Sequence, residues 1–292
     1  MGAVGRDKLP PKASLEIRKA YTHNMADVKG EILARMRDEV GAIDKDAAEA
    51  IALVYPSPYN VGMSSLGFQT IYRGINGVQG RAAHRAFLPD DVEAAQRSRA
   101  PLVTYEQLRP VSDYPILAFS VAYEAELAGL IQALDLAGVP PLAEERGPRH
   151  PFILAGGPLT FSNPLPLAPF VDAVLMGEAD ESIHSVLDLL FSAESRESAL
   201  RALSGHPHVY VPSLDGDRLP PIDKASKRTL PAFSQIITPH TELRNMYLIE
   251  PERGCHRGST YCVMRRSTND GMRIVKKDEL LALVPEHAKR VG

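Results

Sequence analysis

Short, uninterrupted apolar runs alternate with segments of helical periodicity between residues 51 and 191. The runs are IALVY, ILAFSV, FILAGG and DAVLMG, and helical segments follow three of them: MSSLGFQTIYRGIN, EAELAGLIQALDLAG and ESIHSVLDLLF. Because the runs are continuous, they predict strands buried on both faces, the pattern of a parallel sheet covered by helices. We therefore expect an α/β fold with a doubly wound parallel sheet, whose ligands bind beyond the carboxyl ends of the strands.

The segments on either side of this region differ from it. The first fifty residues are charged and contain Pro10 and Pro11, with one predicted helix over residues 25–40, and we expect an N-terminal helical appendage. A proline-rich stretch with the strand-like VYVPSL predicts a linker with a small hairpin. The strand candidate MYLIE, the loop PERGCHRGSTYCVMRR and the helix KKDELLALVPEHAKRV follow as one β-loop-α unit. The predicted parts are 1–50, 51–191, 192–245 and 246–292.

Composition and charge exclude several classes of partner. The 292 residues are 44% hydrophobic, and 33 basic against 36 acidic side chains give a net charge of -3, which offers no long-range attraction for nucleic acid or an anionic membrane. No apolar run approaches the roughly 18 to 20 residues of a membrane span, and the start MGAVGRDKLPPK lacks the apolar centre of a secretory signal. We expect a cytoplasmic protein that binds small-molecule cofactors.

The two cysteines of the chain, Cys255 and Cys262, lie in one loop. A pair seven residues apart is not a disulfide framework, so the spacing indicates a metal or redox role. An isolated pair of this kind is more often two ordinary thiols. Here the flanking residues form a pattern that an isolated pair lacks: a predicted strand ends at Glu250, an Arg-Gly pair precedes Cys255, Tyr261 precedes Cys262, and a predicted helix follows. Whether the loop binds a metal cluster stays open.

With these flanking residues the loop resembles the radical S-adenosylmethionine (SAM) superfamily, whose signature is C-x-x-x-C-x-x-C after a first barrel strand, with an aromatic residue before the last cysteine. The resemblance implies a 4Fe-4S cluster bound by Cys255 and Cys262, SAM on the open iron, and Tyr261 at the cofactor. Ser259 occupies the middle ligand position, where a hydroxyl is a poor substitute for a thiolate. The chain is either a substituted active enzyme or a degenerate copy.

The last unit also bears on the fold, because one β-loop-α unit cannot close a barrel. The sequence stops at Gly292, where the next strand would begin. We therefore expect an incomplete radical SAM barrel segment, whose remainder is either missing or supplied by a companion chain.

Residues 51 onward also resemble the N-terminal domain of cobalamin-binding radical SAM proteins, on the segments LAFSVAYEAELAGLIQALDLAGVP, ILAGGP and VLMGEADES. The resemblance implies a Rossmann-like cobalamin-binding fold, in which the cofactor lies across the carboxyl edge of a five-stranded sheet and its nucleotide tail enters the sheet. The residues implied to line it follow successive strands: Ser120, Val121, Gly156, Gly157, Gly177 and Glu178. Glycines there let a bulky ligand approach the backbone, although they also suit ordinary βα turns.

The loop after the first strand is a second candidate for contact with the cofactor. It is fixed by prolines and leads into a helix with small polar residues, so its backbone amides are free to meet a phosphate or a ring edge. Its candidate binding residues are Tyr59, Asn60, Gly62, Met63 and Ser64. The D-x-H-x-x-G loop that supplies a histidine to cobalt is absent from it. Cobalamin would therefore bind without a histidine ligand from this loop.

Three functions remain open at this point. The first is a cobalamin-dependent radical SAM enzyme, with chemistry such as methyl transfer, as the resemblance implies. The second is a catalytically degenerate cobalamin-binding or partner module, favoured by Ser259 and the early stop. The third is a flavodoxin-like domain with a redox-active cysteine pair. The sequence names no substrate.

Overall fold

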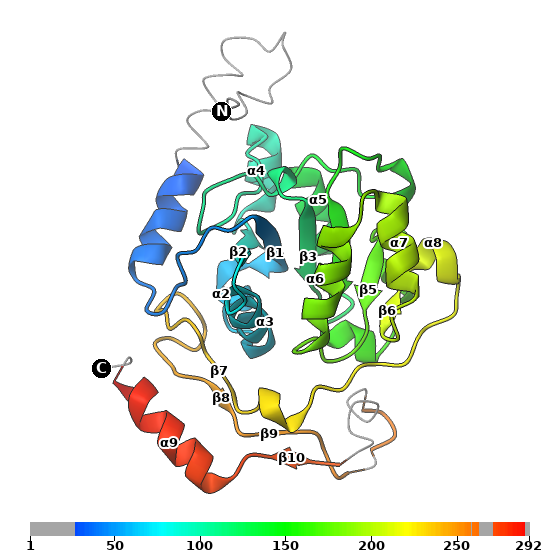
Figure 1. Ribbon diagram of the computed structural model, residues 1–292. Helices are drawn as coiled ribbons and strands as arrows, with labels where there is room; N and C mark the ends of the chain where they lie inside the picture. Colours follow the sequence, from blue (N-terminus) through cyan, green and yellow to red (C-terminus); the bar gives the residue numbers. More distant parts are fainter. Residues whose placement is uncertain (1–26, 258, 263–270, 290–292) are drawn as a thin grey trace.

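A six-stranded sheet forms the centre of the molecule in the computed structural model, which describes residues 27–257, 259–262 and 271–289 (Figure 1). Its strand order is β2-β1-β3-β4-β5-β6, and all neighbouring pairs are parallel except the last. The strands are β1 (Glu49–Pro58), β2 (Arg81–Leu88), β3 (Ile116–Ser120), β4 (Phe152–Gly156), β5 (Ala173–Leu175) and β6 (Val209–Tyr210). The predicted α/β class with a mostly parallel sheet is confirmed.

Helices cover both faces of the sheet, and alternate residues of each strand enter two separate cores. In β1, Ala52 and Val54 face one core and Ile51 and Leu53 face the other. The first core is covered by α4 (Val92–Ser98) and α5 (Glu126–Leu136), and the second by α3 (Leu66–Asn76), α6 (Ser182–Ser192) and α7 (Arg196–Ser204). Burial on both faces explains why the strands are continuous apolar runs.

The strand order reverses direction between β1 and β3. From β1 the chain adds β2 on one side, and then β3, β4 and β5 in turn on the other. The loops that follow β1 and β3 therefore diverge to opposite faces, which opens a crevice at the carboxyl ends of these strands.

Strand β2 was not among the apolar runs that predicted the sheet, because Arg81, His84 and Arg85 interrupt it. All eight residues of β2 are nevertheless buried. The guanidinium of Arg85 is fully buried and pairs with two carboxylates, Glu39 at 2.7 Å and Glu106 at 2.5 Å, whose side chains are also buried. Paired in this way, a charged residue can occupy a position that apolar residues usually fill.

Residues 27–40 pack against this domain, whereas residues 1–26 of the expected appendage lie outside the described range. Residues 27–37 form a helix, within the predicted 25–40, whose first two residues lie outside the described range. Ile32 on this helix joins the core of the domain, and the carboxylate of Glu39 reaches the buried Arg85. Val40 pairs with Ile237 through two backbone hydrogen bonds of 2.9 Å. The segment therefore completes the core.

The segment 192–245 is likewise more than a linker. Helix α7 packs on the second core and β6 extends the sheet, so the predicted strand VYVPSL lies in the sheet itself. The remaining elements here are the short helix α8 (Pro212–Asp215) and β7 (Ala232–Phe233). Single turns connect elements throughout the chain: α2 (Tyr59–Gly62), η1 (Val111–Asp113), η2 (Ala143–Glu145), η3 (Pro158–Phe161), η4 (Leu165–Leu167) and η5 (Lys227–Thr229).

The C-terminal region forms short antiparallel ladders below the sheet in Figure 1. Strand β8 (Ile249–Glu250) pairs with β7, and β9 (Glu252–Arg253) pairs with β10 (Arg273–Ile274). The predicted final helix is confirmed as α9 (Lys277–Ala288), which contains Pro285. The expected barrel strand MYLIE contributes only β8, antiparallel to its partner. No helix in the described ranges is both long and apolar enough to cross a membrane.

Candidate functional site

A cavity of about 440 Å³ opens at the carboxyl ends of β3, β4 and β5, beside Leu53 in the middle of β1. Its floor consists of strand residues, and its side walls come from the start of α3 and from α6. Two residues of the C-terminal segment, Glu250 and Arg253, also line it. The cavity adjoins the point where the strand order reverses, the usual ligand position in open α/β sheets. Its volume lies within the range of small-molecule sites.

Most of the cavity lining is apolar. The apolar side chains come from the strands, from η3 and from both helices: Leu53, Ala118, Phe119, Leu154, Ala155, Phe161, Leu175, Leu66, Ile71 and Ile183. On α3, Gly67, Thr70 and Ile71 share one face because residues three and four apart are neighbours on a helix. The cavity therefore suits a largely apolar part of a ligand.

Carboxylates and two arginines join the rim of this cavity to the C-terminal segment. Arg253 binds Glu250 at 2.7 Å, Asp180 at 3.1 Å and Glu178 at 3.4 Å. Arg273 binds Glu178 at 2.5 Å. Burial lowers the pKa of Arg253, but hydrogen bonds and attraction to Glu250 and Asp180 outweigh burial and raise the pKa above its ordinary value. This network holds the segment that leads into the cysteine loop against the end of β5.

Five of the residues predicted from strand ends lie together in the cavity lining: Ser120, Gly156, Gly157, Gly177 and Glu178. Val121, predicted with them, is fully buried outside the lining. Its amide donates to the carbonyl of Gly156 at 2.8 Å, so it fixes the spacing of two strand ends. Five of the six residues predicted at strand ends therefore lie together at one cavity.

The residues predicted from the loop after β1 do not line the cavity. Tyr59 and Met63 are buried in the core, and the Tyr59 hydroxyl donates to Glu39 at 2.6 Å. Asn60 and Ser64 are bound to each other, since the Ser64 hydroxyl donates to the Asn60 carbonyl at 2.6 Å. A Cβ on Gly62 would overlap the ring of Phe87. The loop turns toward the N-terminal segment, and the cavity is lined instead by the residues that follow it, 65–68.

The three glycines of the rim have different reasons for being glycine. Gly157 and Gly177 have φ of +103° and +92°, and a Cβ on either would overlap the backbone of Val121 or Asp223. Gly156 has neither constraint, because its Cβ would meet Leu175 at 3.4 Å, an ordinary contact. The backbone conformation and close packing require glycine at 157 and 177. Of the three, Gly156 alone has no such structural reason, so a ligand that approaches the backbone could account for it.

This difference predicts the stability of three alanine variants. Gly157→Ala and Gly177→Ala are expected to lower the free energy of unfolding by about 1–3 kcal/mol, because both force a side chain into strained backbone. Gly156→Ala is the matched control and should change it by less than about 1 kcal/mol. Urea denaturation followed by circular dichroism measures all three. Equal losses of unfolding free energy in all three variants would contradict the view that the backbone requires glycine at 157 and 177 but not at 156.

The cysteine loop does not gather a complete set of cluster ligands. Two hydrogen bonds from backbone amides lie within the loop. The Arg257 amide donates to the Cys255 sulfur at 3.3 Å, and the Cys262 amide donates to the Ser259 carbonyl at 3.3 Å. Within the described ranges no three His, Cys, Asp or Glu residues converge on a possible metal position. Tyr261 is 91% exposed. Two thiols and one hydroxyl do not fit the three-thiolate binding of a 4Fe-4S cluster.

Comparison with known families concerns the α/β domain. Residues 67–212 match the family model described as "Radical SAM proteins, N-terminal". The chain belongs to this radical SAM family. The matched span includes β2 to β6 and ends well before the cysteine loop, so membership rests on the domain that contains the cavity floor.

A solved structure with a similar arrangement is the radical S-adenosylmethionine methyltransferase TsrM from Kitasatospora setae, determined with its tryptophan substrate and a SAM analog. The two chains share 10% identity with a TM-score of 0.46, and the match covers 83% of this chain and 46% of that chain. This chain thus spans less than half the length of the methyltransferase. No curated protein matches the chain.

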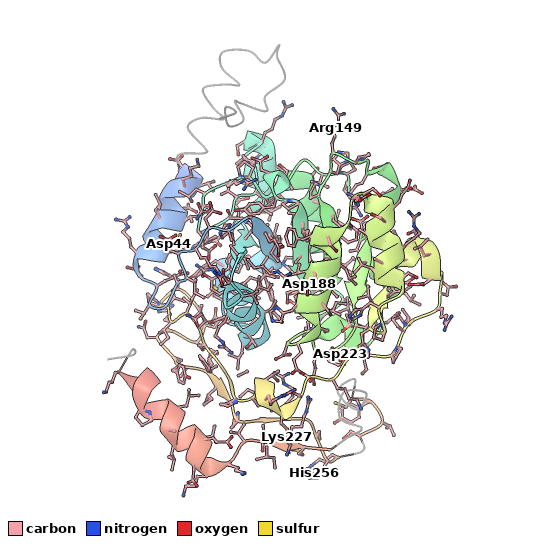
Figure 2. All side chains as sticks on the ribbon, in the orientation of Figure 1. Asp44, Arg149, Asp188, Asp223, Lys227 and His256 are labelled. Atoms are coloured by element: carbon pink, nitrogen blue, oxygen red, sulfur yellow. The ribbon has the colours of Figure 1, made fainter. Side chains whose placement is uncertain are left out.

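Asp180, Arg253, Gly67 and Thr70 are members of the site that the sequence did not indicate as ligand residues. Thr70 could have been found, because it lies one helical turn after Gly67 on a helix that begins at the sheet edge. Asp180 and Arg253 are 73 residues apart, and nothing in either neighbourhood predicts their ion pair. Figure 2 shows Asp223, Lys227 and His256, the residue after Cys255, on the same side of the molecule.

Proposed function

We propose that this chain is the corrinoid-binding part of a radical SAM protein, and that it holds cobalamin at the carboxyl edge of the sheet with the nucleotide tail in the cavity. The observation that carries the proposal is the cavity of about 440 Å³ at the strand-order reversal, lined by Ser120, Gly156 and Gly177. When bound, cobalamin would supply a cobalt centre able to carry a methyl group.

The chain's own residues would bind and orient the cofactor. The apolar strand residues and the face of α3 that lines the cavity would bury the tail. Each Å² of apolar surface removed from water in this way would stabilise the complex by roughly 25 cal/mol. Gly156 would let the tail lie close to β4. No histidine lines the cavity where the structure describes it, so packing and backbone contacts would hold the base of the tail.

The cysteine loop supports the reading of a binding module more than that of a self-sufficient enzyme. Two thiols do not fit the usual cluster, and Ser259 stands where the third would be needed. Assembly of a 4Fe-4S cluster and use of SAM for radical chemistry would then require a ligand from outside this chain, such as a companion chain. In that arrangement Arg253 and its carboxylates would position the loop beside the corrinoid.

Titration of the purified chain with hydroxocobalamin tests the proposal. We expect a saturable change in the visible absorption spectrum, one corrinoid per chain, and retention of the corrinoid through gel filtration. A spectrum that stays equal to the sum of its parts, with all corrinoid in the small-molecule fractions, would overturn the proposal.

The state of the cysteine loop is tested separately with Ser259→Cys. After anaerobic reconstitution with iron and sulfide, we expect this variant to hold several-fold more iron per chain than the native protein, because a third thiolate replaces a hard oxygen donor. Ser112→Cys, which adds a thiol far from the loop in η1, controls for adventitious iron. Equal iron in all three proteins would contradict the assignment of Ser259 to a ligand position.

A further inference from the structure

The β9–β10 ladder and α9 are held to the rest of the chain differently from the segment that precedes them. Among residues 251–289 whose burial the structure describes, only Val275 is buried. The preceding segment is anchored by burial: Ser234 and Ile236 are 1% and 2% exposed, and the Ile236 amide donates to the buried Gln69 side chain at 2.8 Å. A region with few buried side chains belongs to the low-stability end of a structure, where local opening occurs.

Ion pairs carry the attachment of the ladder in place of burial. The hydrogen bonds that the structure describes between residues 251–289 and the rest of the chain come from two side chains, Arg253 and Arg273. Arg253 binds Asp180 at 3.1 Å and Glu178 at 3.4 Å, and Arg273 binds Glu178 at 2.5 Å. These three ion pairs form a clasp between the end of β5 and the ladder.

The two arginines of the clasp lie directly opposite each other in the ladder. Arg253 pairs with Arg273 in the antiparallel register, and opposed residues project from the same face, where like charges repel each other. The hydrogen bond to Glu178 raises the pKa of Arg273 above its ordinary value, although burial and the charge of Arg253 lower it. The Glu178 carboxylate therefore offsets a repulsion that the ladder would have on its own.

The clasp also connects the cavity with the cysteine loop. Glu178 and Arg253 line the cavity, and Arg253 lies two residues before Cys255. A Cβ on Gly254, between them, would lie 2.6 Å from the carbonyl oxygen of Gly271. Because β9 and β10 are so closely packed at this point, the start of the cysteine loop would move together with both strands.

We propose that the clasp is a conformational device that opens and closes as a unit. Closed, it fixes one part of the cavity wall and the start of the cysteine loop together. Open, it frees the β9–β10 ladder and α9 from the end of β5. Opening exposes little apolar surface, because the ladder and α9 bury little, so electrostatics governs the equilibrium. The clasp would act in this way whether or not a corrinoid occupies the cavity.

Trypsin reports on the clasp directly, because it cleaves after an arginine only when the side chain can leave the protein surface and enter the protease. In the closed clasp Arg253 and Arg273 are held by carboxylates, whereas Arg218, in the turn after α8, is exposed. When opening is fast compared with cleavage, cutting after the two clasp arginines tracks the open population. The test therefore measures initial cleavage rates of the full chain by mass spectrometry, relative to the rate at Arg218.

Glu178→Gln keeps the shape of the side chain and removes its charge. We expect relative cleavage after Arg253 and Arg273 to accelerate by about tenfold or more, because both arginines lose a partly buried partner and then repel each other. An unchanged ratio would overturn the proposal. So would an equal acceleration after the buried Arg85, because cleavage there reports unfolding of the whole domain.

Glu181→Gln is the matched control on the neighbouring turn. The Glu181 carboxylate accepts from the amide and the hydroxyl of Ser226, at 2.8 and 2.9 Å, outside the ladder. Cleavage after the clasp arginines should stay within about twofold of the native ratio in this variant. An acceleration as large as that of Glu178→Gln would overturn the assignment of the clasp to Glu178.

A salt titration of the native chain tests the same proposal without any variant. Raising NaCl from about 0.1 M to about 1 M shortens the Debye length from about 10 Å to about 3 Å, so relative cleavage after Arg253 and Arg273 should rise by about threefold or more. In Glu178→Gln the same change of salt should have a smaller effect. A native ratio that is independent of salt would overturn the proposal, because contacts other than ion pairs would then hold the ladder.

Discussion

Glu39→Ala is expected to lower the free energy of unfolding by about 3–5 kcal/mol, because it leaves the charge of Arg85 buried with half of its partners. The Glu39 carboxylate binds both terminal nitrogens of Arg85, at 2.7 and 2.8 Å, and accepts from the Tyr59 hydroxyl. Burial opposes the charge on Arg85, yet Glu106 and Glu39 hold its pKa well above the ordinary value. With the Glu39 carboxylate removed, Glu106 would be the one carboxylate left among the groups described as supporting the charge of Arg85.

An exposed ion pair on the same segment serves as the control. Asp90 binds Arg35 at 2.7 Å, but its side chain is 62% exposed, so Asp90→Ala should cost about 0–1 kcal/mol. Chemical denaturation monitored by circular dichroism compares the two variants. Similar small losses in both would mean that residues 27–40 are a detachable appendage and that Arg85 is stabilised by water or by other groups.

Gly67→Phe is expected to weaken cobalamin binding by roughly thirtyfold, about 2 kcal/mol. Gly67 lines the cavity on the same helical face as Thr70 and Ile71, and a Cβ built on it meets no atom within 4 Å. The backbone at this position therefore has room for a Cβ, and we expect the phenyl ring attached to it to enter the mouth of the cavity. It would occupy the space proposed for the nucleotide tail.

Gly67→Ala separates this effect from a change in the helix. Alanine should stabilise α3 by up to about 1 kcal/mol, since glycine is the poorer helix former, and leave cobalamin affinity within about twofold. Both variants are measured by the same absorption titration and by thermal unfolding. A Gly67→Phe protein that binds cobalamin as tightly as the native chain would place the tail elsewhere.

The extent to which the fold followed from the sequence depends on how each strand is buried. Strands β1, β3, β4 and β5 are apolar runs with both faces covered, and such runs are visible in the sequence. Strand β2 can be buried because Arg85 pairs with Glu39, 46 positions before it, and with Glu106, 21 positions after it. The sequence around Arg85 gives no sign of these distant partners. The ion pair between Arg85 and Glu39 also joins residues 27–40 to the core.

The candidate site divides in the same way. Ser120, Gly156 and Gly177 could be predicted together because parallel strands end at one edge of a sheet. Tyr59 and Met63 follow a strand too, but the turn α2 directs their side chains into the core, and that direction depends on packing with Phe87 and Tyr105. The ion pairs that bring Arg253 to the rim join residues far apart in the chain and needed the structure.

The most direct measurement of the central claim is hydrogen–deuterium exchange with and without hydroxocobalamin. We predict slower exchange at the first turns of α3 and at the ends of β3, β4 and β5, around residues 65–71, 118–122, 154–160 and 175–180, where the cavity is lined. The small cavity of about 50 Å³ between residues 28–35 and β2 serves as an internal reference that should not change. Protection at that reference alone, or nowhere, would contradict a corrinoid site at the carboxyl edge of the sheet.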